Sequence, residues 1–297
     1  MLDLLEEHKL DLLSKKYLKA IYAKGYANIP NLSIDEVRSK FGFIGDNKDF
    51  FSINLNNKNI SYKLFNSPVP TNKLIIYLHG GAYVLRNDKQ NARNCLEIAN
   101  RTKSDVILLH YSLTPEVKFP EPINEVSLFL QNLDKLDIKD IKSKDIYLFG
   151  ESSGANLAVA SILNSKVNFI KGLILINPSL DYYNDYGSKV EFSENYLLDE
   201  NVRRYFATQY INTEEDRKNP LVSPVLSEDL SILPKTFIAN SYHDPVRDEA
   251  FVFHAKLLGK NLDSELHTFN TIHSFLSMNI KPYSDHCFVY IESFLSN

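Results

Sequence analysis

A serine between two glycines stands where a short apolar run gives way to a helical stretch. Gly150-Glu151-Ser152-Ser153-Gly154 follows the run at 145–149 and precedes a helix that begins near Ala155. In this context the pattern Gly-x-Ser-x-Gly is typical of a sharp, strained turn that lifts the serine hydroxyl above a sheet. The helix N-terminus favours negative charge that develops there. We expect Ser152 to be a nucleophile, although the pattern alone also fits a simple turn.

A pair of glycines offers backbone hydrogen-bond donors. His79-Gly80-Gly81-Ala82-Tyr83 comes directly after another apolar run, and adjacent glycines expose N–H groups in a geometry that other residues resist. When a serine attacks an acyl carbonyl, such donors stabilise the oxygen that becomes negative. We expect the N–H groups of Gly80, Gly81 and Ser153 to form this oxyanion hole. Tyr83, one step past the glycine pair, is expected to border the substrate pocket.

A serine hydroxyl needs a general base at neutral pH, and eight histidines compete for that role. His273 lies in the short loop between the last predicted strand and the last predicted helix, which makes it the candidate base. In isolation it also fits a solvated loop histidine. The other seven fall in helices, in strands, in the glycine turn or beside the candidate acid: His8, His79, His110, His243, His254, His267 and His286.

The base in turn needs a carboxylate that fixes its tautomer. Asp244 follows the predicted strand 235–241, and Pro245 holds the chain extended before the next helix starts. Asp181, after the preceding strand, is the rival acid. With Asp244 the order along the chain is Ser152, Asp244, His273, which is the order of α/β-hydrolases and differs from that of chymotrypsin-like and subtilisin-like enzymes.

These residues must be positioned by an alternation of strands and helices. Runs without polar alternation indicate strands covered on both faces, and their alternation with helices predicts a largely parallel sheet of the α/β class. Strands are predicted at 50–56, 59–65, 73–78, 105–111, 145–149, 172–176, 235–241 and 264–270. Helices are predicted at 88–103, 121–136, 153–165, 247–260 and 283–295.

Two segments stand outside this alternation. Residues 1–24 show helical spacing of apolar side chains, and 25–48 are expected to be mostly irregular, with a helical turn after Ser33. Between 176 and 235 lies a connection far longer than usual, with a helix expected behind Asp199 as its N-cap. It is either an added structural subdomain or a lid over the carboxyl ends of the strands. Its aromatic residues are Tyr182, Tyr183, Tyr186, Phe192, Tyr196, Tyr205, Phe206 and Tyr210.

Composition excludes several classes of protein. Lys+Arg 33 against Asp+Glu 37 gives a net charge of -4, which argues against a general nucleic-acid binder. No run approaches the roughly 20 apolar residues that span a bilayer, so we expect no integral membrane association. Two cysteines, Cys95 and Cys287, provide no disulfide framework and are expected to be buried. Acidic residues among the first leucines do not fit a signal peptide, and we expect a cytoplasmic protein.

From about residue 50 onward the chain resembles the hormone-sensitive-lipase-like esterases of the α/β-hydrolase superfamily. The resemblance rests on motifs that occur in order on the expected elements: His79-Gly80-Gly81, Tyr111 to Glu116, Gly150 to Ala158, Ser223-Pro224, Asp244 to Glu249, and His273-Ser274-Phe275. Five positions differ from the residues that are usual in the motifs of this family: Glu151, Ala82, Ala155, Ser112 and Ser274. These differences affect the expected subfamily and pocket shape more than the reaction.

The resemblance implies an α/β-hydrolase fold with a mostly parallel eight-stranded sheet flanked by helices and covered by a helical cap. On that implication residues 1–45 form N-terminal cap helices and 46–297 form the catalytic domain, with a cap insertion at about 180–228. It also implies hydrolysis of carboxylic esters through a Ser152-Asp244-His273 triad and an acyl-enzyme, with no metal and no organic cofactor.

We expect the substrates to be small esters with short or medium acyl chains or aromatic alcohols, held by the aromatic side chains of the cap. The sequence does not separate this activity from that of an arylformamidase-like amidase, which uses the same groups. A non-catalytic ligand receptor on this fold, as in the plant gibberellin receptors, is less consistent with the complete set of three residues. A homodimer is compatible with the sequence.

Overall fold

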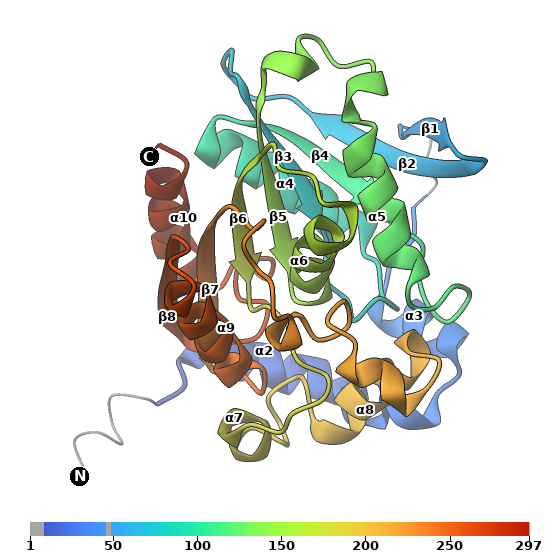
Figure 1. The fold of residues 1–297 in the computed structure, drawn as a ribbon. Coiled ribbons are helices and arrows are strands. Elements are labelled where there is room, and N and C mark those ends of the chain that lie inside the picture. Colours follow the sequence, from blue (N-terminus) through green and yellow to red (C-terminus); the bar gives the residue numbers. More distant parts are fainter. Residues whose placement is uncertain (1–8, 46–48, 297) are drawn as a thin grey trace.

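A computed structural model of the chain describes residues 9–45 and 49–296. Its eight-stranded sheet has the order β1-β2-β4-β3-β5-β6-β7-β8 (Figure 1). Strand β2 pairs antiparallel with both β1 and β4, and all other neighbouring strands pair parallel. All eight predicted strands are confirmed. Their bounds are β1 Phe51–Leu55, β2 Lys58–Phe65, β3 Lys73–Leu78, β4 Asp105–His110, β5 Asp145–Glu151, β6 Ile170–Ile176, β7 Lys235–His243 and β8 Ser264–Ile272.

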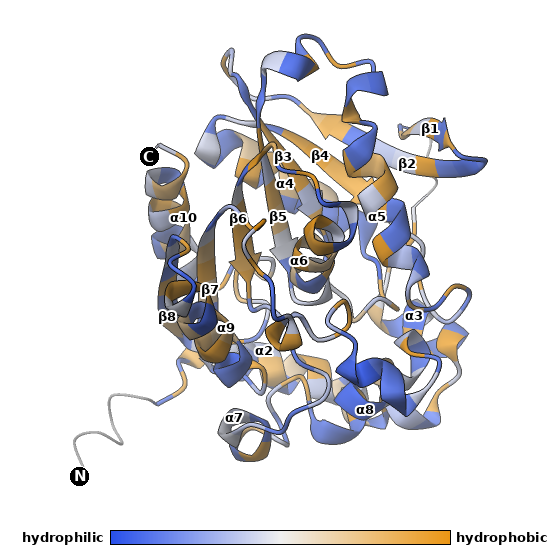
Figure 2. Ribbon diagram, in the orientation of Figure 1, coloured by the Kyte–Doolittle hydropathy of each residue, from blue (hydrophilic) through white to orange (hydrophobic). Residues whose placement is uncertain are grey.

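The uninterrupted apolar runs are explained by helices on both faces of the sheet. In β3, Leu74, Ile76 and Leu78 belong to one core cluster, whereas Ile75 and Tyr77 belong to the other. Successive strand residues point to opposite faces, so a strand buried on both sides must be apolar throughout. Figure 2 shows the central strands coloured as hydrophobic, in contrast to the largely hydrophilic helix α8.

The five predicted helices between the later strands are also confirmed. Helices α5, α6 and α9 contribute side chains to the first core cluster, and α4 and α10 contribute to the second. The helix predicted at 121–136 ends earlier and continues as a short 3-10 helix, η2 Leu133–Lys135. The bounds are α4 Asp88–Thr102, α5 Glu121–Gln131, α6 Ser153–Ser165, α9 Arg247–Gly259 and α10 Tyr283–Phe294.

The N-terminal segment is more helical than predicted. After α2 Leu12–Ala23 come a 3-10 helix, η1 Tyr26–Asn31, and helix α3 Ile34–Phe41. We expected a mostly irregular chain here with one helical turn after Ser33; that turn is present as the start of α3, and the rest is more helical. The reason is a capping box, in which Ser33 and Glu36 satisfy each other's backbone N–H groups and start α3. Residues 1–8 and 46–48 of the predicted lead-in lie outside the described residues.

The long connection after β6 forms α7 Gly187–Glu191, α8 Glu200–Tyr210 and the 3-10 helices η4 Glu214–Lys218 and η5 Pro224–Leu226. Helices α2, α3, α7 and α8 gather at the end of the molecule where the parallel strands finish (Figure 1). Side chains of α2 and η1 share the second core cluster with Val202 and Phe206 of α8. The N-terminal segment and the connection therefore pack together.

Three smaller predictions have different outcomes. Asp199 occupies the N-cap position of α8, but its side chain caps no helix amide and instead accepts a hydrogen bond from the hydroxyl of Tyr22. Cys95 and Cys287 are buried and free, as predicted. Among the helices of the described residues, none is both long and apolar enough to cross a bilayer.

Candidate active site

The turn between β5 and α6 holds Ser152 in a strained backbone conformation. Its φ of 55° and ψ of −118° are unusual for a residue with a side chain. The flanking glycines make this turn fit, because a Cβ on Gly154 would lie 2.1 Å from the carbonyl oxygen of Leu78. The backbone N–H of Ser152 donates a 2.9 Å hydrogen bond to the carbonyl oxygen of Ile176, which ties the turn to the end of β6.

The candidate base and acid lie within hydrogen-bond reach of this serine. Nε2 of His273 is 2.9 Å from Oγ of Ser152, and Nδ1 of His273 is 2.8 Å from Oδ2 of Asp244. A carboxylate only accepts, so Nδ1–H donates to Asp244 and Nε2 faces the serine with its lone pair. His273 follows β8 and Asp244 follows β7, so adjacent parallel strands deliver the two groups to the same edge of the sheet.

Asp181, the rival acid, and His79, in the glycine turn, have other hydrogen-bond partners. The carboxylate of Asp181 accepts hydrogen bonds from the N–H groups of Tyr183 and Asn184 and from the hydroxyl of Tyr186, so it organises the start of the connection. Nδ1 of His79 lies 2.7 Å from the carbonyl oxygen of Gly80 and donates to it, which fixes the glycine turn. Burial lowers the pKa of His79 to about 3, so its ring stays neutral.

Asn177 is a member of the site that the sequence analysis missed. Its side-chain nitrogen donates to Oδ2 of Asp244 at 2.8 Å and to Oγ of Ser241 at 2.9 Å. Its oxygen accepts the N–H of Ser274 at 3.2 Å, so the same amide holds the acid and the loop of His273. It follows β6 at the strand edge that carries the site. That position was the only signal available, and one asparagine after a strand is too common to single out.

The glycine turn lies beside the serine with its donors available. A Cβ on Gly80 would lie 3.3 Å from Cβ of Ser152, and Gly81 has a φ of +116°. Within the described part of the chain, the N–H groups of Gly80, Gly81 and Ser153 donate to no protein acceptor. Tyr111 supports the turn through a 2.7 Å hydrogen bond from its hydroxyl to the carbonyl oxygen of His79.

Burial and the nearby acidic groups have opposite effects on the pKa of the His273 imidazole. Burial lowers the pKa of His273, but the charge and hydrogen bond of Asp244 outweigh it, and Glu151 and Glu249 act in the same direction. The pKa of His273 is therefore raised above its ordinary value of 6.5. Burial also raises the pKa of the Glu151 carboxyl, which lies next to Ser152 in the chain.

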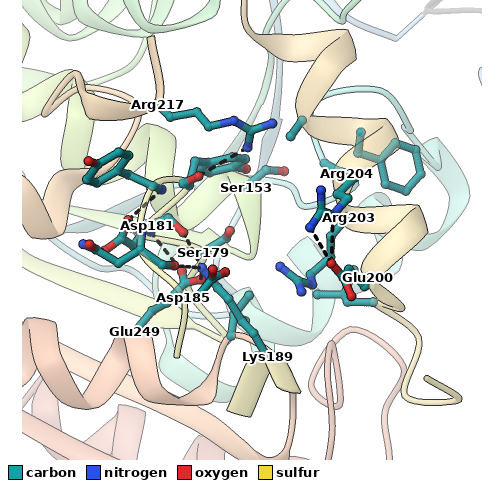
Figure 3. Close-up of a pocket in the computed structure, with 18 of the residues that line it drawn as sticks. Ser153, Ser179, Asp181, Asp185, Lys189, Glu200, Arg203, Arg204, Arg217 and Glu249 are labelled. Carbon is teal, nitrogen blue, oxygen red and sulfur yellow. Dashed lines mark hydrogen bonds and ion pairs between the residues drawn. The ribbon is translucent and has the colours of Figure 1, made fainter. Parts of the chain in front are cut away.

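A pocket of about 240 Å³ opens beside the serine and is lined by Ser152, Ser153 and Ala82 (Figure 3). Its outer wall comes from the connection after β6 and from α9. The expectation for Tyr83 is not met, because its ring is 1% exposed and stacks on Tyr210 at a centroid distance of 3.7 Å. Ala82 and Tyr83 both have positive φ angles, which the sequence did not indicate.

The pocket is also more polar than the aromatic composition of the connection led us to expect. Tyr182, Tyr183 and Phe206 line it, whereas Tyr205 turns toward the N-terminal segment, where its hydroxyl lies 3.4 Å from the carbonyl oxygen of Leu32. The aromatic residues thus serve largely in packing. The charged lining residues are Asp181, Asp185, Lys189, Glu200, Arg203, Arg204, Glu214, Arg217 and Glu249.

A buried ion pair joins this wall to α9. Nζ of Lys189 lies 3.0 Å from the carboxylate of Glu249, and that carboxylate also accepts the N–H groups of Leu180 and Asp181. Glu249 belongs to the Asp244 to Glu249 motif that the sequence analysis quoted, but Lys189 carried no signal. In residues 9–45 and 49–296, no group of three or more His, Cys, Asp or Glu side chains is arranged to hold a metal ion.

A serine hydroxyl, an imidazole and a carboxylate in hydrogen-bonded series beside free amides can transfer acyl groups through a covalent intermediate. With the sheet order described above, this arrangement defines the class of α/β-hydrolases. The family pattern described as "alpha/beta hydrolase fold" matches residues 75–277. The chain belongs to the hormone-sensitive-lipase-like family of that fold.

Known esterases are similar to this chain over most of its length. It is 28% identical to an arylesterase of Saccharolobus solfataricus over 90% of this chain and 92% of the relative. It is 31% identical to an acetyl esterase of Salmonella schwarzengrund over 71% of this chain and 68% of the relative. The hyperthermophilic esterase of the archaeon Pyrobaculum calidifontis superposes with a TM-score of 0.81 at 22% identity, covering 96% of this chain and 97% of that structure.

Proposed function

We propose that this protein is a serine carboxylesterase that uses Ser152 as nucleophile, His273 as general base and Asp244 as the orienting acid. The observation that carries the proposal is the unbroken series of hydrogen bonds from Oγ of Ser152 through His273 to Asp244, at 2.9 and 2.8 Å. The relatives named arylesterase and acetyl esterase favour an ester with a short acyl group or an aromatic alcohol.

In this reaction Nε2 of His273 takes the proton of Ser152 as its oxygen attacks the ester carbonyl. The N–H groups of Gly80, Gly81 and Ser153 stabilise the negative oxygen of the tetrahedral intermediate. The imidazolium then protonates the leaving alcohol, and the same imidazole activates the water that hydrolyses the acyl-enzyme. Asp244 keeps the Nδ1–H tautomer and stabilises the charged ring.

We further propose that the N-terminal helices and the connection at about 180–228 form a cap over the site. The shared core cluster of Leu18, Tyr26, Val202 and Phe206 supports this division, because it joins the two segments to each other at the carboxyl ends of the strands.

A fluorophosphonate probe and p-nitrophenyl acetate test the proposed chemistry together. We expect covalent labelling at Ser152, and loss of ester turnover by roughly 10⁴- to 10⁶-fold in Ser152→Ala. Ser161→Ala is the matched control, since Ser161 is a buried serine of α6 whose hydroxyl donates to the carbonyl oxygen of Ala158. Wild-type turnover in Ser152→Ala would refute the assignment, and an unlabelled wild-type protein would favour a ligand receptor.

The amidase alternative is tested with N-formylkynurenine. An amide has a poorer leaving group than an aryl ester, so an esterase is expected to prefer p-nitrophenyl acetate by a wide margin in kcat/KM. Faster turnover of the amide than of the ester, measured with the same preparation, would replace the esterase proposal by the amidase.

A further inference from the structure

One cation in the pocket beside Ser152 has no counter-ion. Lys189 is 3.0 Å from Glu249, Arg204 is 2.6 Å from Glu200, and Arg217 is 2.5 Å from Glu214. Arg203 lines the same pocket, yet no carboxylate in the described part of the chain lies within ion-pair distance of its guanidinium. Its Nε is buried and has no hydrogen-bond partner there.

The acidic residues near Arg203 either have other partners or do not reach its guanidinium. Asp199, one turn before Arg203 on α8, accepts the hydroxyl of Tyr22. Glu200, also one turn before, forms an ion pair with Arg204 on the same helix (Figure 3). Asp185 is exposed to solvent and does not reach the guanidinium.

A half-buried guanidinium without a partner is unfavourable, because it has lost part of its hydration without a compensating ion pair. Burial accordingly lowers the pKa of Arg203, against the opposing effect of Glu249, Glu200 and Asp185. An arginine remains charged at neutral pH even so. A planar guanidinium binds a carboxylate through two parallel hydrogen bonds, which suits an anionic group that arrives with a ligand.

We propose that Arg203 binds a carboxylate on the substrate, so that the preferred ester of this protein carries a negative charge on the arm that enters the pocket next to Ser152. This inference rests on the proposed esterase function and deepens it. With Arg203 included, the lining of the pocket has four cations and five acids, so a group with a single negative charge fits better than a dianionic phosphate.

Two matched pairs of esters test the proposal, one for each arm of the substrate. The first pair is para-acetoxybenzoate and the neutral para-acetoxybenzamide. The second is the mono-p-nitrophenyl ester of glutaric acid and p-nitrophenyl valerate. The measured quantity is the ratio of kcat/KM for the charged ester to kcat/KM for its neutral partner. Arg203→Met is expected to lower this ratio by roughly 10- to 100-fold in at least one pair, as loss of a charged hydrogen bond does.

Two further variants sharpen the result. Arg203→Lys keeps the positive charge but loses the planar guanidinium that makes two parallel hydrogen bonds. It should retain part of the preference for the charged ester over the neutral one. Lys171→Met makes the same change of charge at an exposed position near the start of β6, outside the pocket, and should keep both ratios. Arg203→Met should also unfold at the wild-type temperature or higher, because it removes a cation without a partner.

The proposal is overturned if both ratios survive in Arg203→Met, or if that variant unfolds at a clearly lower temperature, which would assign Arg203 to the fold. In either case normal fluorophosphonate labelling of Ser152 and normal hydrolysis of neutral esters by the wild type leave the esterase function standing. A wild-type protein that is neither labelled nor active on any of the four esters would remove the function and this inference together.

Discussion

The side-chain nitrogen of Asn177 donates a 2.8 Å hydrogen bond to Oδ2 of Asp244, the same oxygen that accepts the Nδ1–H of His273. Since Asn177 also accepts the N–H of Ser274, one neutral side chain fixes both the acid and the loop that presents the base. The proposed triad is therefore held by a fourth residue, which follows β6, the strand between β5 and β7.

We predict that Asn177→Ala acts on the triad and not only on the fold. Loss of this donor concentrates negative charge on the oxygen that faces His273, which should raise the pKa of the imidazole further and shift the acid limb of the kcat/KM profile to higher pH. We expect kcat to fall by roughly tenfold or more. Asn240→Ala, at a buried amide of β7 that donates to the carbonyl oxygen of Arg247, is the control. An unshifted acid limb in Asn177→Ala would reduce Asn177 to a structural residue.

The same substitution, aspartate to asparagine, made at each candidate acid in turn, tests which of the two orients His273. Asp244→Asn should lower kcat by roughly 10⁴-fold, because the amide no longer holds the Nδ1–H tautomer of His273. Asp181→Asn should cost far less, because the carboxylate of Asp181 organises the turn at Tyr183, Asn184 and Tyr186. The assay is hydrolysis of p-nitrophenyl acetate. If Asp181→Asn were the damaging change, the acid would have to be reassigned.

The pH profile follows from the raised pKa of His273. The imidazole must be neutral to accept the serine proton, so kcat/KM should fall as the pH is lowered, with a midpoint above 6.5. Asp244→Asn removes the charge that does most to raise the pKa of His273, while burial still lowers it and Glu151 and Glu249 still raise it. The pKa of the imidazole should fall, and the midpoint of the profile should move to lower pH. A wild-type midpoint below 6.5 would contradict this account.

The sheet and the convergence of Ser152, Asp244 and His273 could be predicted from sequence for a local reason. Strands buried on both faces are continuous apolar runs, such as Leu74 to Leu78, and they are visible without knowledge of their neighbours. Ser152, Asp244 and His273 each follow such a run, and parallel strands bring their carboxyl ends to one edge. The prediction thus required only the order of elements and the residue types just after them.

The remaining features depend on contacts between distant parts of the chain. Asn177 and Asp244 are 67 residues apart, and nothing in either segment marks the other as its partner. The ring of Tyr83 is buried against that of Tyr210, on a backbone whose positive φ angles at Ala82 and Tyr83 are uncommon for such residues. The unpaired state of Arg203 likewise follows only once the partners of Asp199 and Glu200 are known.

The glycine turn gives a prediction based on steric fit. A Cβ on Gly81 would lie 2.2 Å from the carbonyl oxygen of Leu85, and its φ of +116° disfavours any side chain. Gly81→Ala should therefore displace the turn and lower kcat by roughly 10²- to 10³-fold, as loss of an oxyanion donor does, with a small effect on KM. Gly187→Ala is the control, because its Cβ would meet only Asp248 at 3.4 Å. Unchanged kcat in Gly81→Ala would exclude this turn from the oxyanion hole.

The ion pair between Lys189 and Glu249 gives a prediction about stability. Both side chains are nearly inaccessible, at 6% and 1% exposure, so Lys189→Met leaves a buried carboxylate without its counter-charge. We expect the free energy of unfolding to fall by about 3–5 kcal/mol, measured by urea denaturation at neutral pH. Lys218→Met breaks the solvent-exposed pair with Glu215, whose charges are screened by water, and should lower the free energy of unfolding far less. Equal losses in the two variants would mean that the carboxylate of Glu249 is satisfied by the N–H groups of Leu180 and Asp181 alone, without Lys189.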